Sequence, residues 1–337
     1  MKAVAYYQSL PSSDPESLQD IELPAPTPGP RDLLVQVRAI SVNPVDSKIR
    51  SNVAPTDGQA KVLGWDVAGV VQALGSEVSL FQVGDEVFYA GALQRAGGNS
   101  ELHVVDERIV GHKPKHLGFA EAAALPLTAI TAWELLFERL KIAEGSASHG
   151  QSLLIIGAAG GVGSILTQLA RQLTGLTVIG TASRPETADW VRQLGAHHVI
   201  DHSQPLLPQL QQLGISQVEH VASLTHTDQH YEQLIEALAP QGQLALIDDP
   251  AQLDVVKLKR KSLSLHWEFM YTRSLFETPD MQAQHALLER VAQLIDAGTL
   301  HTTLGEHFGS INANNLRRAH TLLESGKARG KIVLEGF

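Results

Sequence analysis

The stretch LLIIGAAGGVGSILTQLARQL, residues Leu153–Leu173, decides the fold of this protein. Four aliphatic residues lead into a group of glycines, which predicts a buried strand and then a tight turn. Apolar residues then recur three and four positions apart, which predicts an amphipathic helix. These residues are Ile165, Leu166, Leu169, Ala170 and Leu173. The stretch therefore predicts a strand that turns directly into a helix.

The spacing Ala158-x-Gly160-x-x-Gly163 in this turn is a dinucleotide-binding pattern, with Ala158 in place of the first glycine. Gly160 lets the backbone approach a pyrophosphate, and Gly163 lets the helix pack closely on the strand. The helix N-terminus offers free N–H groups to the phosphates. We expect five residues to bind the pyrophosphate: Ala159, Gly160, Gly161, Val162 and Gly163. The alternative is a tight turn that holds no ligand.

The end of the next predicted strand distinguishes the two nicotinamide dinucleotides. NAD-binding proteins carry an acidic residue there, about 20 positions after the glycines, which binds the ribose 2′-OH. This chain has Thr181-Ala-Ser-Arg184 instead, and a guanidinium beside a hydroxyl suits a 2′-phosphate. Ser183 and Arg184 therefore predict NADPH as the cofactor. The alternative is that Arg184 only caps the loop before a helix that begins at Pro185.

Strand-like runs alternate with amphipathic helices from Gln151 to about Glu268, which indicates an α/β fold with a parallel, doubly wound sheet. Its predicted strands are Ser152–Gly157, Leu176–Ala182, His197–Ile200, Val218–Leu224, Gln243–Asp248 and Leu263–Phe269. The last of these would be an edge strand, which is an aggregation hazard unless it is covered.

The sequence on either side of this alternating segment predicts a different pattern of secondary structure. Residues 1 to about 115 contain short strands separated by Pro and Gly: Lys2–Tyr7, Asp32–Val42, Asp66–Leu74, Asp85–Ala90 and Glu101–Asp106. Later elements are helices at Phe119–Leu140 (interrupted at Pro126), Met281–Gly298 and Asn312–Ser325, and a strand with the sequence KIVLE. The mixed segment therefore lies inside a discontinuous β-rich domain.

Length and composition narrow the function classes. The 337 residues suggest two domains, at roughly 150 residues per domain. A formal net charge of −10 argues against a nucleic-acid partner, because phosphate backbones are bound by clustered cations. The chain has no cysteine, which excludes disulfides and thiolate zinc sites. We expect no membrane partner and a cytoplasmic location, because we find no signal peptide and no apolar run of roughly 18 residues.

Segments along essentially the whole chain match one family, in that family's order. They are SVNPVDSKIRSN (Ser41–Asn52), LGWDVAGVVQALGSEVSLFQVGDEVFYAG (Leu63–Gly91), AAALPLTAITAWELL, GAAGGVG and GKIVLE. The chain resembles medium-chain dehydrogenases/reductases of the zinc-independent quinone oxidoreductase (zeta-crystallin-like) type. The resemblance implies a Rossmann NADP-binding domain at 125–274, inserted in a GroES-like substrate domain at 1–124 and 275–337. It also implies a homodimer in which the edge strand pairs with its copy.

Zinc-dependent members of that superfamily bind a catalytic metal with Cys, His-Glu and Cys. The matching positions here are Asn43, Trp65-Asp66 and, near the last Cys, Leu127. Trp and Leu cannot ligate zinc and Asn is a poor ligand, so one carboxylate cannot make a three-ligand site. The four-cysteine structural lobe is absent as well, since Asp85–Glu101 passes through GALQRAGGN. We therefore expect no metal site.

Without zinc, nothing lowers the pKa of an alcohol or polarises a ketone. Hydride transfer from NADPH to an electron-poor acceptor, a quinone or an α,β-unsaturated carbonyl (enone), needs less help. We expect four residues in the catalytic cleft: Asn43, Asp46, Lys48 and Trp65. Asn43 can donate a hydrogen bond to a carbonyl oxygen, and Lys48, where relatives commonly have tyrosine, can donate a proton. Alternatively, Lys48 is a solvated surface lysine and Trp65 is core packing.

Six further residues are predicted to contact the cofactor: Thr131, His202, Leu224, Thr225, Ile247 and Lys331. The resemblance places Thr131 near the nicotinamide, although helix packing is its alternative role. It places His202 where relatives often have a tyrosine near the adenosine phosphate. Residues after the fourth and fifth strands are included because doubly wound sheets bind ligands there. A lysine that relatives carry is Thr187 here, which shifts the phosphate contact onto Arg184.

Two other functions stay open from the sequence. One is an NADPH-linked carbonyl or alcohol oxidoreductase that uses Lys48 as its acid. The other is a non-catalytic NADPH-binding sensor or partner protein, similar to lens-crystallin relatives. An intact cleft segment, Asn43–Lys48, together with an intact nucleotide turn argues against the second.

Overall fold

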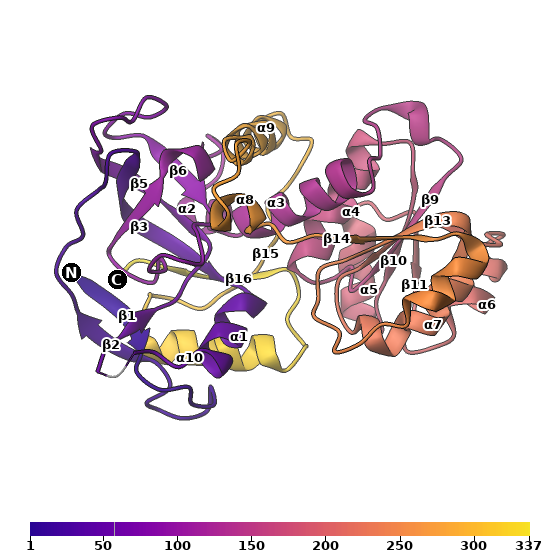
Figure 1. Cartoon of the computed structure of the whole chain (residues 1–337), viewed down its shortest axis with the longest axis horizontal. Helices are drawn as coiled ribbons and strands as arrows, with labels where there is room; N and C mark the ends of the chain where they lie inside the picture. The colour runs from indigo at the N-terminus through magenta and orange to yellow at the C-terminus, as the bar shows by residue number, and fades with distance from the viewer. Residues whose placement is uncertain (57) are drawn as a thin grey trace. The chain divides into compact units, whose positions relative to one another are not determined.

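The structure is a computed structural model that describes residues 1–56 and 58–337. It divides the chain into two units: unit 1 comprises Met1–Ile130 and Tyr271–Phe337, and unit 2 comprises Thr131–Met270. The chain enters unit 2 through helix α3 (Pro126–Trp133) and leaves it before helix α8 (Thr272–Leu275) (Figure 1). Unit 2 is therefore an insertion within the sequence of unit 1.

Unit 2 contains a six-stranded parallel sheet in the order β11-β10-β9-β12-β13-β14. The strands are β9 (Ser152–Ile156), β10 (Thr177–Thr181), β11 (His198–Ile200), β12 (Val218–Ser223), β13 (Leu238–Leu246) and β14 (Ser264–Trp267). The first strand, β9, lies inside the sheet, and the strand order reverses between β9 and β12. Doubly wound sheets bind ligands at such a reversal. The predicted doubly wound sheet is confirmed.

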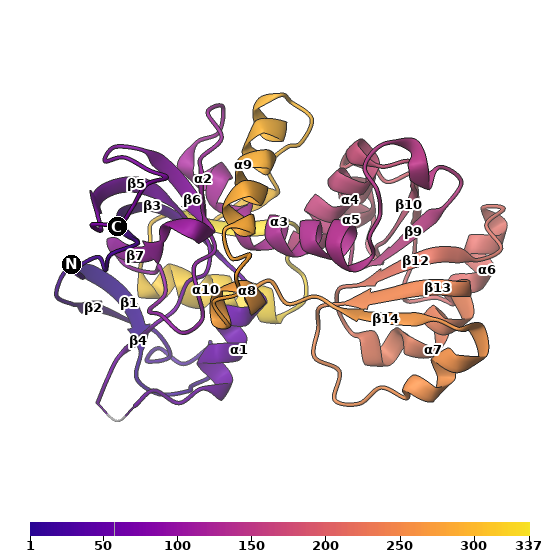
Figure 2. The ribbon, with the colours of Figure 1, turned by 45° about the horizontal axis from the view of Figure 1, so that its top comes forward.

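Helices cover both faces of this sheet (Figure 2). Helices α4 (Gly161–Leu173) and α5 (Pro185–Gln193) lie on one face, and α6 (Leu206–Gln212) and α7 (Thr227–Ala237) lie on the other. All five residues of β9 are buried as a result. Leu210 of α6 and Leu234 of α7 belong to the hydrophobic core with Leu154 and Ile156 of β9. Unit 2 also contains η2 (Glu134–Arg139), η3 (Ser146–Ser148) and η4 (Val255–Lys261).

Unit 1 is built on a seven-stranded sheet in the order β15-β16-β3-β5-β6-β8, with β7 also pairing with β3. These strands are β3 (Asp32–Val42), β5 (Val67–Leu74), β6 (Glu86–Tyr89), β7 (Leu102–Asp106), β8 (Val110–His112), β15 (Leu304–His307) and β16 (Lys331–Glu335). A second sheet, in the order β2-β1-β4, contains β1 (Lys2–Tyr6), β2 (Gln19–Glu22) and β4 (Lys61–Val62). Because Ile332 pairs with Val42, the start of β16 lies beside the end of β3.

Unit 1 also contains one 3₁₀ turn and several helices. They are η1 (Glu107–Ile109), α1 (Pro44–Asn52), α2 (Phe119–Ala123), α8, α9 (Ala283–Asp296) and α10 (Ala313–Glu324). Helices α1 and α10 lie side by side in both views (Figures 1 and 2). The predicted interruption at Pro126 is present, because α2 ends at Ala123 and α3 begins at Pro126.

The segment Phe119–Arg139 passes, by length and composition, the test for a membrane-crossing helix. The segment contains Glu121, Thr128 and Glu134, so it is not an uninterrupted run of apolar residues. In addition, 78% of its most apolar 18-residue window is buried within the protein, which is typical of a core helix.

Several elements were not predicted from the sequence. They include strands β2, β4, β8 and β15 and helices α1 and α8. Helix α1 is rich in residues with low helix propensity, so its stability comes from tertiary contacts. The Tyr6 hydroxyl donates to Val53 O at 2.7 Å, and Arg50 forms an ion pair with Glu324 of α10. These partners are distant in sequence, and local patterns do not reveal them.

Candidate functional site

Asn43 connects β3 to α1 and is the N-cap residue of that helix. Its backbone N–H donates to Asp46 Oδ2 at 2.8 Å, and the Asp46 N–H donates to Asn43 O at 3.0 Å. Pro44 occupies the first helical position, where its missing N–H has no cost. This turn fixes Asn43 in the interior of unit 1, where the residue is 1% exposed.

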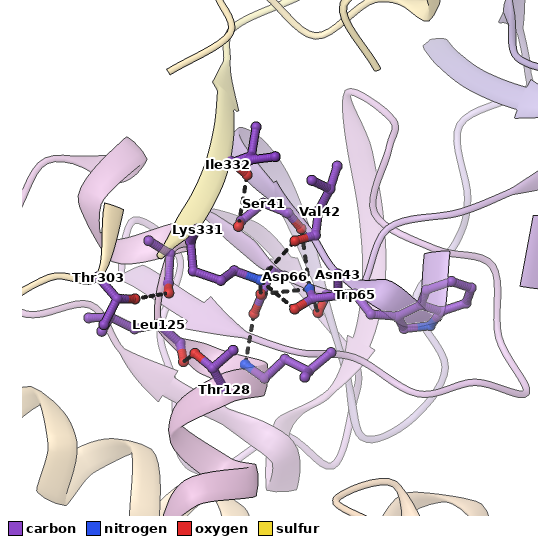
Figure 3. A network of polar contacts seen from close by, with 12 residues as sticks. Ser41, Val42, Asn43, Trp65, Asp66, Leu125, Thr128, Thr303, Lys331 and Ile332 are labelled. Atoms are coloured by element: carbon purple, nitrogen blue, oxygen red, sulfur yellow. Dashed lines mark hydrogen bonds and ion pairs between the residues drawn. The ribbon is translucent and has the colours of Figure 1, made fainter. Parts of the chain in front are cut away.

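The ammonium of Lys331 lies in a buried network beside Asn43 (Figure 3). Lys331 Nζ donates to Asp66 Oδ2 at 2.8 Å, to Val42 O at 2.9 Å and to Asn43 Oδ1. Asn43 Nδ2 also donates to Asp66 Oδ2 at 2.8 Å, and the Leu127 N–H donates to Asp66 Oδ1 at 2.8 Å. A buried ion pair needs this degree of hydrogen bonding to offset the loss of water.

Two buried carboxyl groups in this region have perturbed pKa values. Burial raises the pKa of Asp66, while the Lys331 ammonium and the N–H donors of Leu127 and Asn43 oppose the rise. Burial raises the pKa of Asp46 to about 7, and the neighbouring charge of Asp66 adds to this rise. The backbone N–H groups of Asn43 and Gly64 and the Lys331 ammonium oppose the rise. Asp46 therefore exchanges its proton near neutral pH, as a general acid or base requires.

Trp65 and Lys48 lie in contrasting environments. Trp65 is 1% exposed, its indole N–H donates to Ala92 O at 3.3 Å, and its ring points away from the network (Figure 3). Lys48 lies on α1 and is exposed. The contact of either residue with substrate stays a prediction.

The sequence did not reveal the buried Tyr271, whose pKa is raised well above its usual value by burial and by the charges of Asp46 and Asp66.

The side chains at the positions that match zinc ligands do not fit a zinc ion. Asp66 is the one carboxylate among them, and Lys331 already forms an ion pair with it. The ammonium also binds Asn43 Oδ1, and it has no lone pair with which to ligate a metal. Zinc sites are built from Cys, His and carboxylate ligands, three or four at a time. Among residues 1–56 and 58–337, no group of three or more His, Cys, Asp or Glu side chains could hold a metal ion.

In unit 2 the glycine turn has the geometry that its spacing predicts. Gly157 has φ +76°, which favours glycine. A Cβ on Gly163 would lie 2.5 Å from Ala158 Cα, so the close packing of α4 on β9 requires this glycine. A Cβ on Gly160 would have no neighbour closer than Gly157 O at 3.5 Å, so the space beside Gly160 is open. No acidic side chain lies in the first turn of α4, whose N–H groups suit a phosphate.

A pocket of about 290 Å³ lies at the carboxyl ends of β9, β11 and β12. It adjoins the glycine turn, because Ile156 and Gly157 line it. Its polar lining includes His202, Thr225, His226 and His230. The last two histidines were not predicted, because they belong to the polar start of α7 and carry no motif. The open turn and this pocket fit a dinucleotide.

The loop after β10 lies beside this pocket's lining. The Ala182 N–H donates to Ile200 O at 3.0 Å, which holds the loop that carries Ser183 and Arg184 next to the loop that carries His202. Arg184 is the N-cap residue of α5 and forms an ion pair with Glu186 at 3.2 Å. Its contact with a phosphate stays a prediction, and so does that of the exposed Ser183.

The other predicted cofactor residues are dispersed. Thr131 is 5% exposed on α3, and Leu224 and Ile247 are half-buried after β12 and β13. Lys331 belongs to unit 1, where three oxygens accept its hydrogen bonds. Its direct contact with a cofactor stays a prediction. The structure does reveal its partner Asp66, which is 265 positions away.

Two family models match the chain: an alcohol dehydrogenase GroES-like domain at residues 29–133 and a zinc-binding dehydrogenase at residues 194–334. A zinc-type alcohol dehydrogenase-like protein of Staphylococcus aureus is 39% identical, with 99% of each chain covered. A quinone oxidoreductase of Pseudomonas aeruginosa is 33% identical, with 95% of this chain and 96% of the relative covered.

Solved structures agree with these matches. A Rhizobium etli protein whose name refers to zinc-dependent alcohol dehydrogenase has a TM-score of 0.96 and 56% identity, and the match covers 100% of this chain and 98% of the other. A mycobacterial protein complexed with NADPH has a TM-score of 0.83 and 27% identity, and the match covers 99% and 100%. The chain belongs to the medium-chain dehydrogenase/reductase superfamily and is an oxidoreductase of that superfamily.

Proposed function

We propose that this protein is an NADPH-dependent reductase that transfers hydride to a quinone or an enone without zinc. The observation that carries the proposal is the buried Lys331 ammonium, which binds Asp66 and Asn43 at the positions that match zinc ligands. That donor set leaves no ligand group for a metal. Without a Lewis acid, the acceptor itself must be electron-poor, as quinones and enones are.

The residues of unit 2 would hold the cofactor. The N–H groups at the start of α4, from Gly161 onward, suit the pyrophosphate, and the open space at Gly160 allows its approach. Arg184 and Ser183 suit the 2′-phosphate of NADPH. When bound, NADPH supplies the hydride. The quinone oxidoreductase relative and the NADPH-bound structural neighbour support this assignment.

Residues of unit 1 would supply the proton that accompanies the hydride. Reduction of a quinone or an enone by hydride is completed by a proton. Asp46, with a pKa of about 7, holds a proton part of the time at neutral pH. Asn43 has a positioning role, because it holds Asp46 through its backbone and Asp66 through its side chain.

A second candidate is an NADPH-linked carbonyl or alcohol oxidoreductase. It is favoured by the names of the Staphylococcus aureus and Rhizobium etli proteins, which refer to alcohol dehydrogenase. In that reaction Lys48 or Asp46 would deliver a proton to a carbonyl oxygen. The two candidates differ in product, because one reduces C=C and the other reduces C=O.

The deciding experiment is NADPH oxidation by protein treated with EDTA, with a quinone, an enone and a saturated ketone as separate acceptors. We expect turnover of the quinone or enone to survive the chelator and the enone product to keep its carbonyl. Loss of turnover on chelation that Zn²⁺ restores would refute the zinc-free mechanism. Formation of an allylic alcohol would support the second candidate instead.

Cofactor choice is tested separately by Arg184→Asp. The carboxylate should repel a 2′-phosphate, so the Kd for NADPH should rise at least about tenfold while that for NADH changes little. Arg192→Asp, in the last turn of the same helix, is the matched control. Equal affinities for NADPH in wild type and Arg184→Asp would refute the phosphate assignment.

A further inference from the structure

The pocket at the carboxyl ends of β9, β11 and β12 contains three histidines from two elements. His202 follows β11, whereas His226 and His230 belong to the start of α7. The rings of His202 and His230 lie 5.9 Å apart with an interplanar angle of 76°. His226 has φ +50°, a left-handed conformation that is uncommon for residues other than glycine, and its Nδ1 lies 2.7 Å from Thr225 Oγ1.

Two of these rings have unused hydrogen-bonding capacity. Nδ1 of His202 and Nδ1 of His230 are buried and make no hydrogen bond. Buried polar atoms without partners are rare in proteins, and each one suggests a specific role. Both rings line the pocket, so a ligand there can interact with them.

The charged groups around the rings favour neutral imidazoles in the free protein. Burial lowers the pKa of His202 and of His230, and the other histidines of the cluster lower them further. Three carboxylates oppose this effect: Asp201 acts on His202, and Asp228 and Asp248 act on His230. Asp248 already accepts the Thr227 N–H at the start of α7, at 2.8 Å. A bound anion would add negative charge and favour the imidazolium forms.

The place of the pocket suggests which anion. The hydrogen bond from Ala182 to Ile200 holds the Ser183–Arg184 loop next to the loop of His202. Arg184 is always positively charged, whereas each histidine is positively charged only when its imidazole is protonated. A phosphate monoester with a charge of −1.5 to −2 at neutral pH matches this combination.

We propose that His202 and His230 bind the 2′-phosphate-bearing adenosine of NADPH by taking up a proton, so that protons and NADPH bind cooperatively. The inference rests on the proposed function, because it assigns the proton linkage of the same cofactor site. As pH falls, the imidazolium forms become easier to populate, so NADPH affinity rises. NADH has no 2′-phosphate, so its affinity depends less on pH. The histidines therefore make the preference for NADPH over NADH increase toward acidic pH.

The test measures the Kd values of NADPH and NADH between pH 6.5 and 8.5, using the full chain. For each proton taken up on binding, the NADPH affinity should rise by up to about tenfold for each unit by which the pH is lowered. Titration calorimetry in two buffers of different ionisation enthalpy counts the protons directly. The 2′-phosphate itself titrates near pH 6, but that contribution is the same for every variant.

The variants are His202→Asn and His230→Gln, with His149→Gln, an exposed histidine elsewhere in unit 2, as the control. The first two should flatten the pH dependence of NADPH binding and remove the proton uptake, and the control should keep both. Identical slopes for NADPH and NADH, or an unchanged slope in both pocket variants, would overturn the inference. If NADPH does not bind at any pH, the proposed function itself is wrong.

Discussion

At the scale of single residues, Lys331 and Asp66 form an ion pair in which both side chains are at most 3% exposed. Lys331→Met should lower the free energy of unfolding by about 3–5 kcal/mol, because Asp66 would be left as an unpaired buried charge. Urea denaturation measures this loss. Lys331→Met combined with Asp66→Asn should recover part of it, because the new amide can donate to Asn43 Oδ1. A double variant as unstable as the single one would contradict the ion-pair explanation.

Asp46 gives a second prediction at this scale, one that concerns pH. The side chain ionises near pH 3.8 in the unfolded chain and near 7 in the folded protein. Between these values the folded state keeps a proton that the unfolded state loses, so Asp46 lowers stability as pH rises from about 4 to 7. Asp46→Asn should remove a dependence of up to about 1.4 kcal/mol per pH unit.

Unfolding free energies of wild type and Asp46→Asn at pH 5.0 and 7.5 test this prediction. The variant should gain stability relative to wild type at the higher pH. Glu22→Gln changes an exposed carboxyl group of the same unit and serves as the control, whose stability curve should stay parallel to that of wild type. Parallel stability curves for wild type and Asp46→Asn would show that Asp46 ionises at its ordinary pKa.

At the scale of elements, two glycines at the junction of β9 and α4 have different roles. Gly163 is needed for the packing of the helix on the strand, whereas Gly160 is expected to contact the cofactor. Gly163→Ala should destabilise the protein by about 1–3 kcal/mol, because the new Cβ would meet Ala158 Cα and Gly157 O at 2.5 Å. Gly160→Ala should change stability by less than about 0.5 kcal/mol, because nothing lies closer than 3.5 Å and its φ of −74° suits alanine.

The affinity for NADPH should respond differently from stability, because the variant that is nearly as stable as wild type, Gly160→Ala, should bind NADPH poorly. Gly160→Ala should weaken NADPH binding by at least about tenfold, since its methyl group would fill the approach to the backbone. Thermal unfolding and NADPH fluorescence titration measure the two effects. If Gly160→Ala binds NADPH as tightly as wild type, the open space is not the pyrophosphate site.

These glycines also show where sequence reasoning succeeds. Gly160 and Gly163 are three residues apart, so their spacing alone encodes a strand–turn–helix unit. Asp66 and Lys331 are 265 residues apart. They meet because β3 pairs with β16 on one side and, on the other, with β5, which Asp66 directly precedes. Likewise, His230 meets His202 only because β11 and β12 end at the same edge of the sheet. Local motifs therefore predicted the turn, whereas contacts made by topology needed the structure.

At the scale of the whole molecule, the order of the chain determines when unit 1 can be completed. The chain leaves this unit at Ile130 and returns at Tyr271. The last strand, β16, pairs with β3 and brings Lys331 to Asp66. The buried network in unit 1 therefore forms only after the whole of unit 2 has been synthesised.

The same scale includes assembly, for which we predict a homodimer through β14. Within the described part of the chain, β14 lies at the end of its sheet and pairs only with β13. Trp267 is 52% exposed on it, and Phe269, two residues later, is 47% exposed. An open edge with exposed aromatic side chains favours association, and pairing with a second copy about a twofold axis would cover it.

Trp267→Lys should therefore convert the dimer to a monomer, because a charged side chain on an edge strand opposes pairing. Light scattering at micromolar concentration should give twice the chain mass of 36.4 kDa for wild type and the single chain mass for the variant. Phe276→Lys, which changes an aromatic residue that is 71% exposed in unit 1, should stay dimeric. A monomeric wild type would refute the dimer, and a dimeric Trp267→Lys would place the interface on another surface.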